Sequence, residues 1–239
     1  LVLVSALVYS CHGFNAFQVA NVFLLFGMLS LGRLYKREEP AVALFNAGAW
    51  LGLASLFRPE YGLFLLAFFT GLSILRRVEL RSVLQILTGG GLIYFFLIVF
   101  SYFKGNLGAV LSEQFSAFGW PTLLPTSVPN KIGLGVIGLV IIGVLLGYRS
   151  ITTMLNIEGS KNTSLLAWTM LYAILVIAFS GEITPLSVQA ATVPLGGLLG
   201  LGLVTIKPSR AEVVHLLLVV AAVLPLLLSL FGGADAGAM

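Results

Sequence analysis

Apolar residues dominate this chain in long runs that short polar segments separate. A helix needs about 20 apolar residues to cross the roughly 30 Å of hydrocarbon in a bilayer. The runs predict one domain over 1–239, an all-α polytopic transmembrane helix bundle with about nine spans. The chain starts inside the first run, at Leu1, without a charged segment before it, which predicts a truncated span and upstream sequence rather than a signal peptide. The expected spans are 1–10, 17–32, 41–57, 61–75, 83–103, 132–148, 164–180, 186–206 and 212–231.

The positions of the basic residues predict an orientation for these spans. The even-numbered connections hold ten of the 13 Lys and Arg residues, and the odd-numbered connections hold only Arg58, Lys104 and Lys131. Because cytoplasmic loops of membrane proteins carry the excess of Lys and Arg, the even connections are predicted to be cytoplasmic. The carboxyl terminus is then predicted to lie outside.

Composition excludes several other classes of protein. The 239 residues are 59% hydrophobic and 9% charged, and the mean hydropathy is +1.06. An ordinary soluble domain has about 25% charged residues, and so few charges could not cover the surface of a soluble domain of this length. A soluble globular protein, a disordered chain and a nucleic-acid-binding module are therefore excluded. The expected surroundings are a lipid bilayer and other membrane proteins.

Cysteine and histidine are too rare to suggest a metal or redox centre. Cys11 is the single cysteine, so no intrachain disulfide is expected, and His12 and His215 lie near opposite ends of the chain. The sequence also contains no phosphate-binding loop, no nucleophile elbow and no dinucleotide-binding fingerprint. We therefore predict neither a metal site nor a cofactor site.

The segment 104–131 is the longest stretch outside the predicted spans. Its first half carries an apolar face at helical spacing, formed by Leu107, Val110, Leu111, Phe115 and Phe118. Glu113 and Gln114 lie off that face, and three prolines follow from Pro121 onward. The pattern predicts a short helix in the outer interface and then an extended segment. An ordinary connecting loop is the alternative.

Pairs of glycines four residues apart predict close helix packing. Each pair places two residues without side chains on one helix face, which lets two backbones approach each other in lipid. These packing candidates are Gly48, Gly52, Gly143, Gly147, Gly196 and Gly200. Packing within the chain and docking of another subunit both remain open. The run Gly89-Gly90-Gly91 in span 83–103 favours a close crossing of two helices, and a broken transport helix is its alternative.

Arg58-Pro59-Glu60-Tyr61 is a charged cluster wedged between two apolar runs, at the predicted outer boundary. Proline suits the first position of a helix, and an acid in the first turn interacts favourably with the helix dipole. One interpretation is an interhelical turn with an exposed ion pair. The other is a site in which Arg58 holds a phosphate and Glu60 a hydroxyl group or a proton. Glu182 is a further acid at this boundary and a weak catalytic candidate beside Arg58 and Glu60.

The run from Leu44 to Phe57, LFNAGAWLGLASLF, resembles a Bacteroidota family of polytopic inner-membrane proteins known as a domain of unknown function. The basic Arg33–Arg37 loop before it and the Gly-rich span after it extend the resemblance to about residues 1–105. Arg58 and Glu60 depart from the family, whose corresponding turn is usually apolar. The resemblance implies the inner membrane of a didermal bacterium and implies no assigned activity.

A second resemblance concerns only the turn from Arg58 to Tyr61. It is similar to a turn of C-type membrane glycosyltransferases, which use polyprenyl-phosphate sugar donors and carry their catalytic acid in an outer loop upstream. The resemblance implies a polyprenyl-phosphate lipid as a ligand. The first hypothesis for function is nevertheless an integral subunit or scaffold of a cell-envelope complex without a catalytic role. The glycosyltransferase is the alternative, and a solute transporter is the third.

Overall fold

Helices make up most of the computed structural model of this protein. The structure describes residues 15–35, 40–116, 118–123, 135, 138–144, 147–148, 152–183, 186–205 and 208–232. The elements are α2 (Ala16–Gly32), α3 (Ala41–Phe57), η1 (Pro59–Leu63), α4 (Phe64–Leu75), α5 (Leu80–Phe103), α6 (Leu107–Ser116), β1 (Gly119–Leu123), α8 (Ile157–Ala178), β2 (Ser180–Ile183), η2 (Ser187–Ala191), α9 (Thr192–Thr205) and α10 (Pro208–Gly232). Residues 138–144 are also helical, and the predicted span 1–10 lies outside the described residues.

Local sequence signals set several helix ends. Asn15 caps α2 by accepting a 3.0 Å hydrogen bond from the amide of Gln18, and Asn156 caps α8 by accepting one of 2.7 Å from Gly159. Asparagine suits this position because its side-chain oxygen pairs a backbone amide that has no partner inside the helix. The second cap explains why α8 begins at Ile157, before the predicted span 164–180, and therefore includes Glu158 and Lys161.

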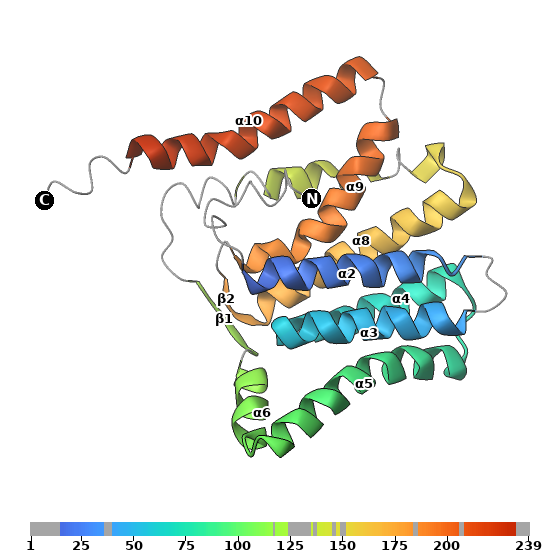
Figure 1. Ribbon diagram of the computed structural model, residues 1–239. Helices are drawn as coiled ribbons and strands as arrows, with labels where there is room; N and C mark the ends of the chain where they lie inside the picture. The colour runs from blue at the N-terminus through green and yellow to red at the C-terminus, as the bar shows by residue number, and fades with distance from the viewer. Residues whose placement is uncertain are drawn as a thin grey trace, which may run out of the picture.

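The core lies where α2, α3, α4 and α8 pack side by side (Figure 1). Leu24 of α2, Leu44 of α3, Phe68 of α4 and Leu165 of α8 are all buried there. Between α2 and α3, the ring of Phe23 stacks on Trp50 at a centroid distance of 5.8 Å. Such pairs of apolar faces hold neighbouring helices in one arrangement.

Helix α5 packs against the bundle mainly through α3, at the lower edge of the view in Figure 1. The helix is continuous through its glycine run, which contradicts the alternative of a broken transport helix. A Cβ built at Gly89 would lie 2.1 Å from the carbonyl oxygen of Phe45, so this glycine permits a close approach of the two backbones. The three glycines therefore mark a helix crossing.

A short pair of strands departs from the all-α prediction. β1 and β2 pair in parallel, with Gly119 opposite Ser180 and Leu123 opposite Ile183. The pair closes the same end of the bundle as η1 and η2 (Figure 1). Pairing of this kind joins segments that are far apart in the sequence, and no local pattern predicts it. The protein is thus a helical bundle with one small parallel sheet.

The segment predicted to be a helix followed by an extended stretch holds α6 and then β1. One detail of the prediction is wrong. Gln114 lies on the side of α6 that faces the bundle, because its amide donates a 3.2 Å hydrogen bond to the carbonyl oxygen of Leu56 at the end of α3. A polar side chain can take a position on the packed face when a free backbone carbonyl is within reach.

Three described helices are long and apolar enough to cross a membrane. They are Leu80–Phe103, Ile157–Ala178 and Ser187–Thr205. Four further apolar helices are shorter, namely Ala16–Gly32, Ala41–Phe57, Pro59–Leu75 and Ala211–Val220. These lengths and compositions show a helical protein suited to association with a membrane.

Candidate functional site at the Arg58–Glu60 turn

The candidate site is the turn between α3 and α4. Arg58 adopts an extended conformation, with φ −141° and ψ 100°, and Pro59 then starts η1 with Glu60 in its first turn. A residue before proline avoids the helical conformation because the proline ring clashes with its backbone, so α3 ends at Phe57. The backbone amide of Tyr61 donates a 2.9 Å hydrogen bond to the carbonyl oxygen of Arg58 and closes the turn.

Arg58 and Glu60 form an ion pair that is much less exposed than the sequence suggested. Arg58 Nη2 donates to Glu60 Oε1, and the exposed fraction of the side chain is 29% for Arg58 and 0% for Glu60. The Arg58 guanidinium also lies 4.0 Å from the ring centroid of Phe17 on α2. Full burial of Glu60 contradicts the expectation of an exposed pair, because α8 packs against a turn that local sequence would leave in solvent.

Each partner of the ion pair keeps one polar atom without a hydrogen bond. Glu60 Oε2 and Arg58 Nε are both buried and unpaired among the described residues. A buried charged pair is stabilising only when its remaining donors and acceptors also find partners. The turn could therefore accept a group that both donates and accepts a hydrogen bond, such as a hydroxyl or a water molecule.

Tyr61 extends the polar network toward α2 and η2. Its hydroxyl donates a 2.9 Å hydrogen bond to Asn21 Oδ1, and Asn21 Nδ2 donates a 2.9 Å hydrogen bond to the carbonyl oxygen of Gln189. All three residues are buried. This chain of bonds ties three separate elements together at one end of the bundle, because buried polar groups in an apolar core must pair with each other.

The sequence offered a partial signal for this network. Asn21 and Gln189 are conspicuous as polar residues inside apolar runs, but Tyr61 and Phe17 resemble ordinary core aromatics. Asn46 and Gln85, which share the same sequence signal, are exposed and half-buried respectively. The partners therefore came from the tertiary structure alone.

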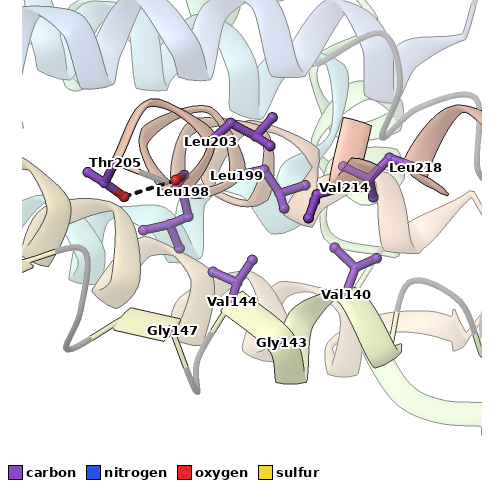
Figure 2. A pocket seen from close by; sticks show the side chains of 11 residues that line it. Val140, Gly143, Val144, Gly147, Leu198, Leu199, Leu203, Thr205, Val214 and Leu218 are labelled. Carbon is purple, nitrogen blue, oxygen red and sulfur yellow. Dashed lines mark hydrogen bonds between the residues drawn. The ribbon is translucent and has the colours of Figure 1, made fainter. Parts of the chain in front are cut away.

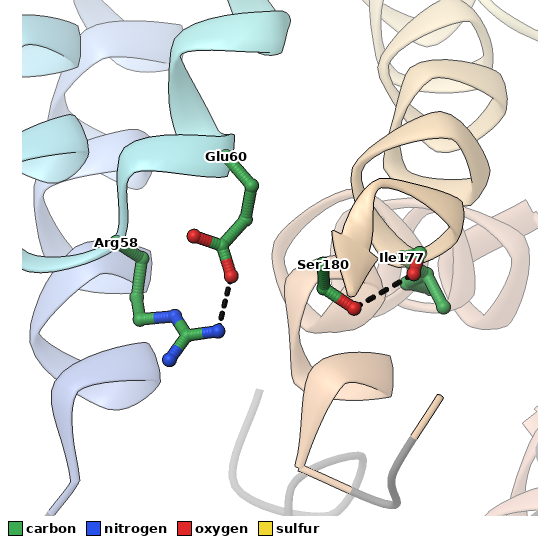
Figure 3. Close-up of polar contacts among 4 residues, drawn as sticks. All are labelled: Arg58, Glu60, Ile177 and Ser180. Carbon is green, nitrogen blue, oxygen red and sulfur yellow. Dashed lines mark hydrogen bonds and ion pairs between the residues drawn. The ribbon is translucent and has the colours of Figure 1, made fainter. Parts of the chain in front are cut away.

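Ser180 and Glu182 lie on β2, next to the end of α8. Figure 3 shows the Arg58–Glu60 pair on one side and this end of α8 on the other, where Ser180 Oγ donates a 2.8 Å hydrogen bond to the carbonyl oxygen of Ile177. The backbone of Glu182 is registered with Thr122 of β1. The carboxylate of Glu182 lies outside the described side chains, so its relation to Glu60 stays a prediction.

The predicted packing glycines fall into two groups. A Cβ built at Gly48 would lie 2.0 Å from the carbonyl oxygen of Ile86, and one at Gly52 would lie 3.0 Å from Gly90 Cα, so both glycines sit at the crossing of α3 and α5. In contrast, no heavy atom of the described residues lies within 4 Å of a Cβ built at Gly143, Gly147 or Gly200.

Two apolar grooves lie away from the Arg58–Glu60 turn. Figure 2 shows the first, of about 390 Å³, in which Val140 and Val144 face Leu198 of α9 and Leu218 of α10, with Gly143 and Gly147 in its wall. The second, of about 420 Å³, lies between α2, α8 and α9, and Gly196 is part of its lining. These volumes are in the range of small-molecule sites.

The described residues hold no group of three or more His, Cys, Asp and Glu side chains that could bind a metal ion. Cys11 and His12 lie outside the described residues. Comparison of the chain with family models, curated proteins and solved structures finds no match.

Proposed function

We propose that this chain is a multi-pass protein of the bacterial inner membrane that serves as an integral subunit or scaffold of a cell-envelope complex. Its partners in this proposal are the lipid bilayer and other membrane proteins. Three observations support the proposal. They are the basic residues at one end of the bundle, the low burial of α5, and the Arg58–Glu60 ion pair, which can hold the turn between α3 and α4 without any catalytic role.

The ends of the helices support the proposed topology of about nine spans with the carboxyl terminus outside. Arg33 caps α2, Arg76 caps α4, and Arg81 lies in the first turn of α5. These ends lie together on one side of the bundle, opposite η1 and the two strands (Figure 1). Under the positive-inside rule, the basic side is cytoplasmic and the Arg58–Glu60 turn is periplasmic.

The observation that carries the subunit role is the open face of α5. Its most apolar stretch is only 11% buried inside the protein, compared with 33% and 44% for the other two candidate spans. Phe95, Phe96 and Phe100 are exposed on this helix. A helix that packs on one side only offers the remaining surface to lipid or to another protein, and large exposed apolar patches are typical of interaction sites.

Site-specific photocrosslinking in cells tests the subunit role. A benzophenone side chain at Phe95 or Phe100 should give a discrete protein adduct of reproducible mass, because both positions face away from α3. Val204 of α9 is the matched control, since it is also highly exposed but lies on another helix. Lipid adducts without a protein adduct at both α5 positions would overturn the proposal.

The glycosyltransferase remains the second candidate, and one observation favours it. Glu60 is fully buried, and among the described residues neither its Oε2 nor the Nε–H of the adjacent Arg58 guanidinium has a hydrogen-bond partner. A polyprenyl-phosphate sugar could supply a phosphate to Arg58 and a hydroxyl to Glu60, and lysine cannot reproduce the bidentate fork of arginine. Under this candidate, Arg58→Lys abolishes an envelope-glycan phenotype at normal protein level. Under the subunit proposal, Arg58→Lys impairs the phenotype only to the extent that it lowers the amount of protein.

A further inference from the structure

The groove between α2, α8 and α9 is suited to an extended apolar chain. Leu25 and Leu29 of α2, Leu166 of α8 and Leu201 of α9 contribute to its walls, and its volume is about 420 Å³. Its lining on α9 runs from Val193 to Leu201, which corresponds to about 12 Å at the helical rise of 1.5 Å per residue. The groove therefore follows the helix axes, as an acyl chain in a bilayer does.

One polar side chain stands among the apolar residues that line this groove. Asn162, near the start of α8, contributes to the lining, and its Oδ1 is buried and finds no hydrogen-bond partner among the described residues. An unpaired buried amide oxygen is unfavourable, and it needs a donor because it can only accept. The terminal torsion of asparagine is broad, so a rotation of the amide turns Oδ1 toward the groove.

Cationic side chains flank Asn162. Lys161 precedes it, and the Lys161 ammonium lies 4.7 Å from the ring centroid of Tyr35, just beyond α2. Arg33 caps the same end of α2 and is exposed. Lys161 and Arg33 thus lie near the Asn162 end of the groove, on the side of the bundle that holds Arg76 and Arg81. Glu158 in the first turn of α8 is an acid at the same end. Basic pockets between transmembrane helices at the cytoplasmic side attract anionic lipid headgroups.

Among the described residues that line the other groove, the polar side chain is Thr205, whose hydroxyl already donates a 2.9 Å hydrogen bond to the carbonyl oxygen of Gly202. The two grooves are similar in volume, and the amide oxygen of Asn162, which has no partner among the described residues, distinguishes the second one.

We propose that the groove between α2, α8 and α9 binds an anionic phospholipid of the cytoplasmic leaflet. One acyl chain occupies the groove, the phosphate lies at Lys161 and Arg33, and a headgroup hydroxyl donates to Asn162 Oδ1. The proposal requires that the bundle is embedded in a membrane, but it does not require the subunit role.

Native mass spectrometry of the delipidated protein in detergent tests this site. The probes are phosphatidylglycerol, whose headgroup has a net negative charge and hydroxyl donors, and phosphatidylcholine with the same acyl chains, whose zwitterionic headgroup has no net charge and no hydroxyl group. We expect phosphatidylglycerol to bind at least about fivefold more tightly, the factor that corresponds to one favourable basic contact. Asn162→Leu and Lys161→Gln should each remove most of this preference. Lys104→Gln is the matched control, because it removes one basic charge beyond the opposite end of α5.

A second pair of variants tests the acyl chain separately from the headgroup. Leu201→Trp fills the groove and should weaken binding of both lipids, whereas Val204→Trp, on the same helix but outside the groove lining, should not. Equal binding of the two lipids by the unmodified protein would overturn the proposal, and so would full binding by Leu201→Trp. A crosslinker at position 201 that captures a protein in membranes would instead identify a helix as the occupant and would also overturn it. The mass spectrometry experiments measure lipid bound to the purified protein. Their outcome therefore does not depend on whether another protein binds α5.

Discussion

Glu60 is an ionisable residue whose side chain is completely buried, and burial disfavours its charged form. Its carboxylate is fully enclosed, yet the described structure gives it a single charged partner, Arg58, which is itself only partly buried. Removal of one member of a buried pair leaves the other without compensation, whereas replacement of both by apolar groups is often neutral. Loss of one partner alone is therefore expected to destabilise the turn, whether or not the turn also binds a ligand.

Glu60→Gln should lower the free energy of unfolding by about 1.5–3 kcal/mol, the usual contribution of a hydrogen bond to a charged group. The double variant Arg58→Met/Glu60→Gln should recover part of that loss, because no charge then remains unpaired. Thermal unfolding in detergent measures both effects, and Glu113→Gln on the exposed side of α6 is the control. An unchanged unfolding temperature for Glu60→Gln would show that the pair contributes nothing.

Tyr61→Phe tests a hydrogen bond between uncharged groups at the same turn. The variant keeps the ring but removes the hydroxyl that donates to Asn21 Oδ1, so it leaves a buried acceptor unpaired. We expect a loss of about 1–2 kcal/mol in the same unfolding measurement. Tyr102→Phe serves as control because Tyr102 is exposed. Equal stability of the two variants would mean that the chain of hydrogen bonds to Gln189 does not hold the three elements together.

At the scale of elements, α3 is the helix on which the bundle depends. It contacts α2 through aromatic side chains and α5 through bare glycine backbones. The contact between α3 and α5 leaves no space for additional side-chain atoms, because the backbones of the two helices lie directly against each other. Steric fit therefore decides the distance between α3 and α5.

Two glycine substitutions separate this packing from helix propensity. Gly48→Ala should disrupt folding or assembly, since the new Cβ would lie 2.0 Å from the carbonyl oxygen of Ile86. Gly91→Ala, on α5, meets no atom within 4 Å and should be neutral or stabilising by up to about 1 kcal/mol. The yield of monodisperse protein and its unfolding temperature measure the difference. Similar yields from both variants would contradict the described α3–α5 crossing.

At the scale of the whole molecule, the two ends of the bundle differ in chemistry. One end collects the basic helix termini around Arg33, Arg76 and Arg81, and the other collects the buried polar turn and the two strands. This asymmetry is the basis of the proposed orientation, since Lys and Arg in short loops set the topology of a membrane protein.

Single-cysteine labelling in a Cys11→Ser background tests that orientation. Cysteines at Glu158 and Ser209 should react with a membrane-impermeant reagent only after the membrane is opened. Cysteines at Glu113 and Ala236 should react in intact spheroplasts. Labelling of the Glu158 position in intact spheroplasts would contradict the topology of nine spans.

The sequence alone determined the helical class, the membrane setting and several element boundaries. Apolar run length and charge placement carry these features because they follow from the transfer of residues between water and lipid, which needs no knowledge of neighbours. Pro59 likewise ended α3 at Phe57 through a local clash. The glycine pattern alone could not separate Gly48, which lies at a close contact between α3 and α5, from Gly143, whose built Cβ has no described heavy atom within 4 Å.

Only the tertiary structure decided which residues meet across long distances in the chain. Burial of Glu60, the bond from Tyr61 to Asn21, and the parallel pairing of β1 with β2 each join segments that share no local pattern. Burial and hydrogen-bond pairing depend on which other residues the fold places beside a side chain. The hydropathy of a residue does not specify these neighbours. Asn162 shows the same limit, because an ordinary amide in a helix became a candidate ligand contact only when α2 and α9 formed a groove around it.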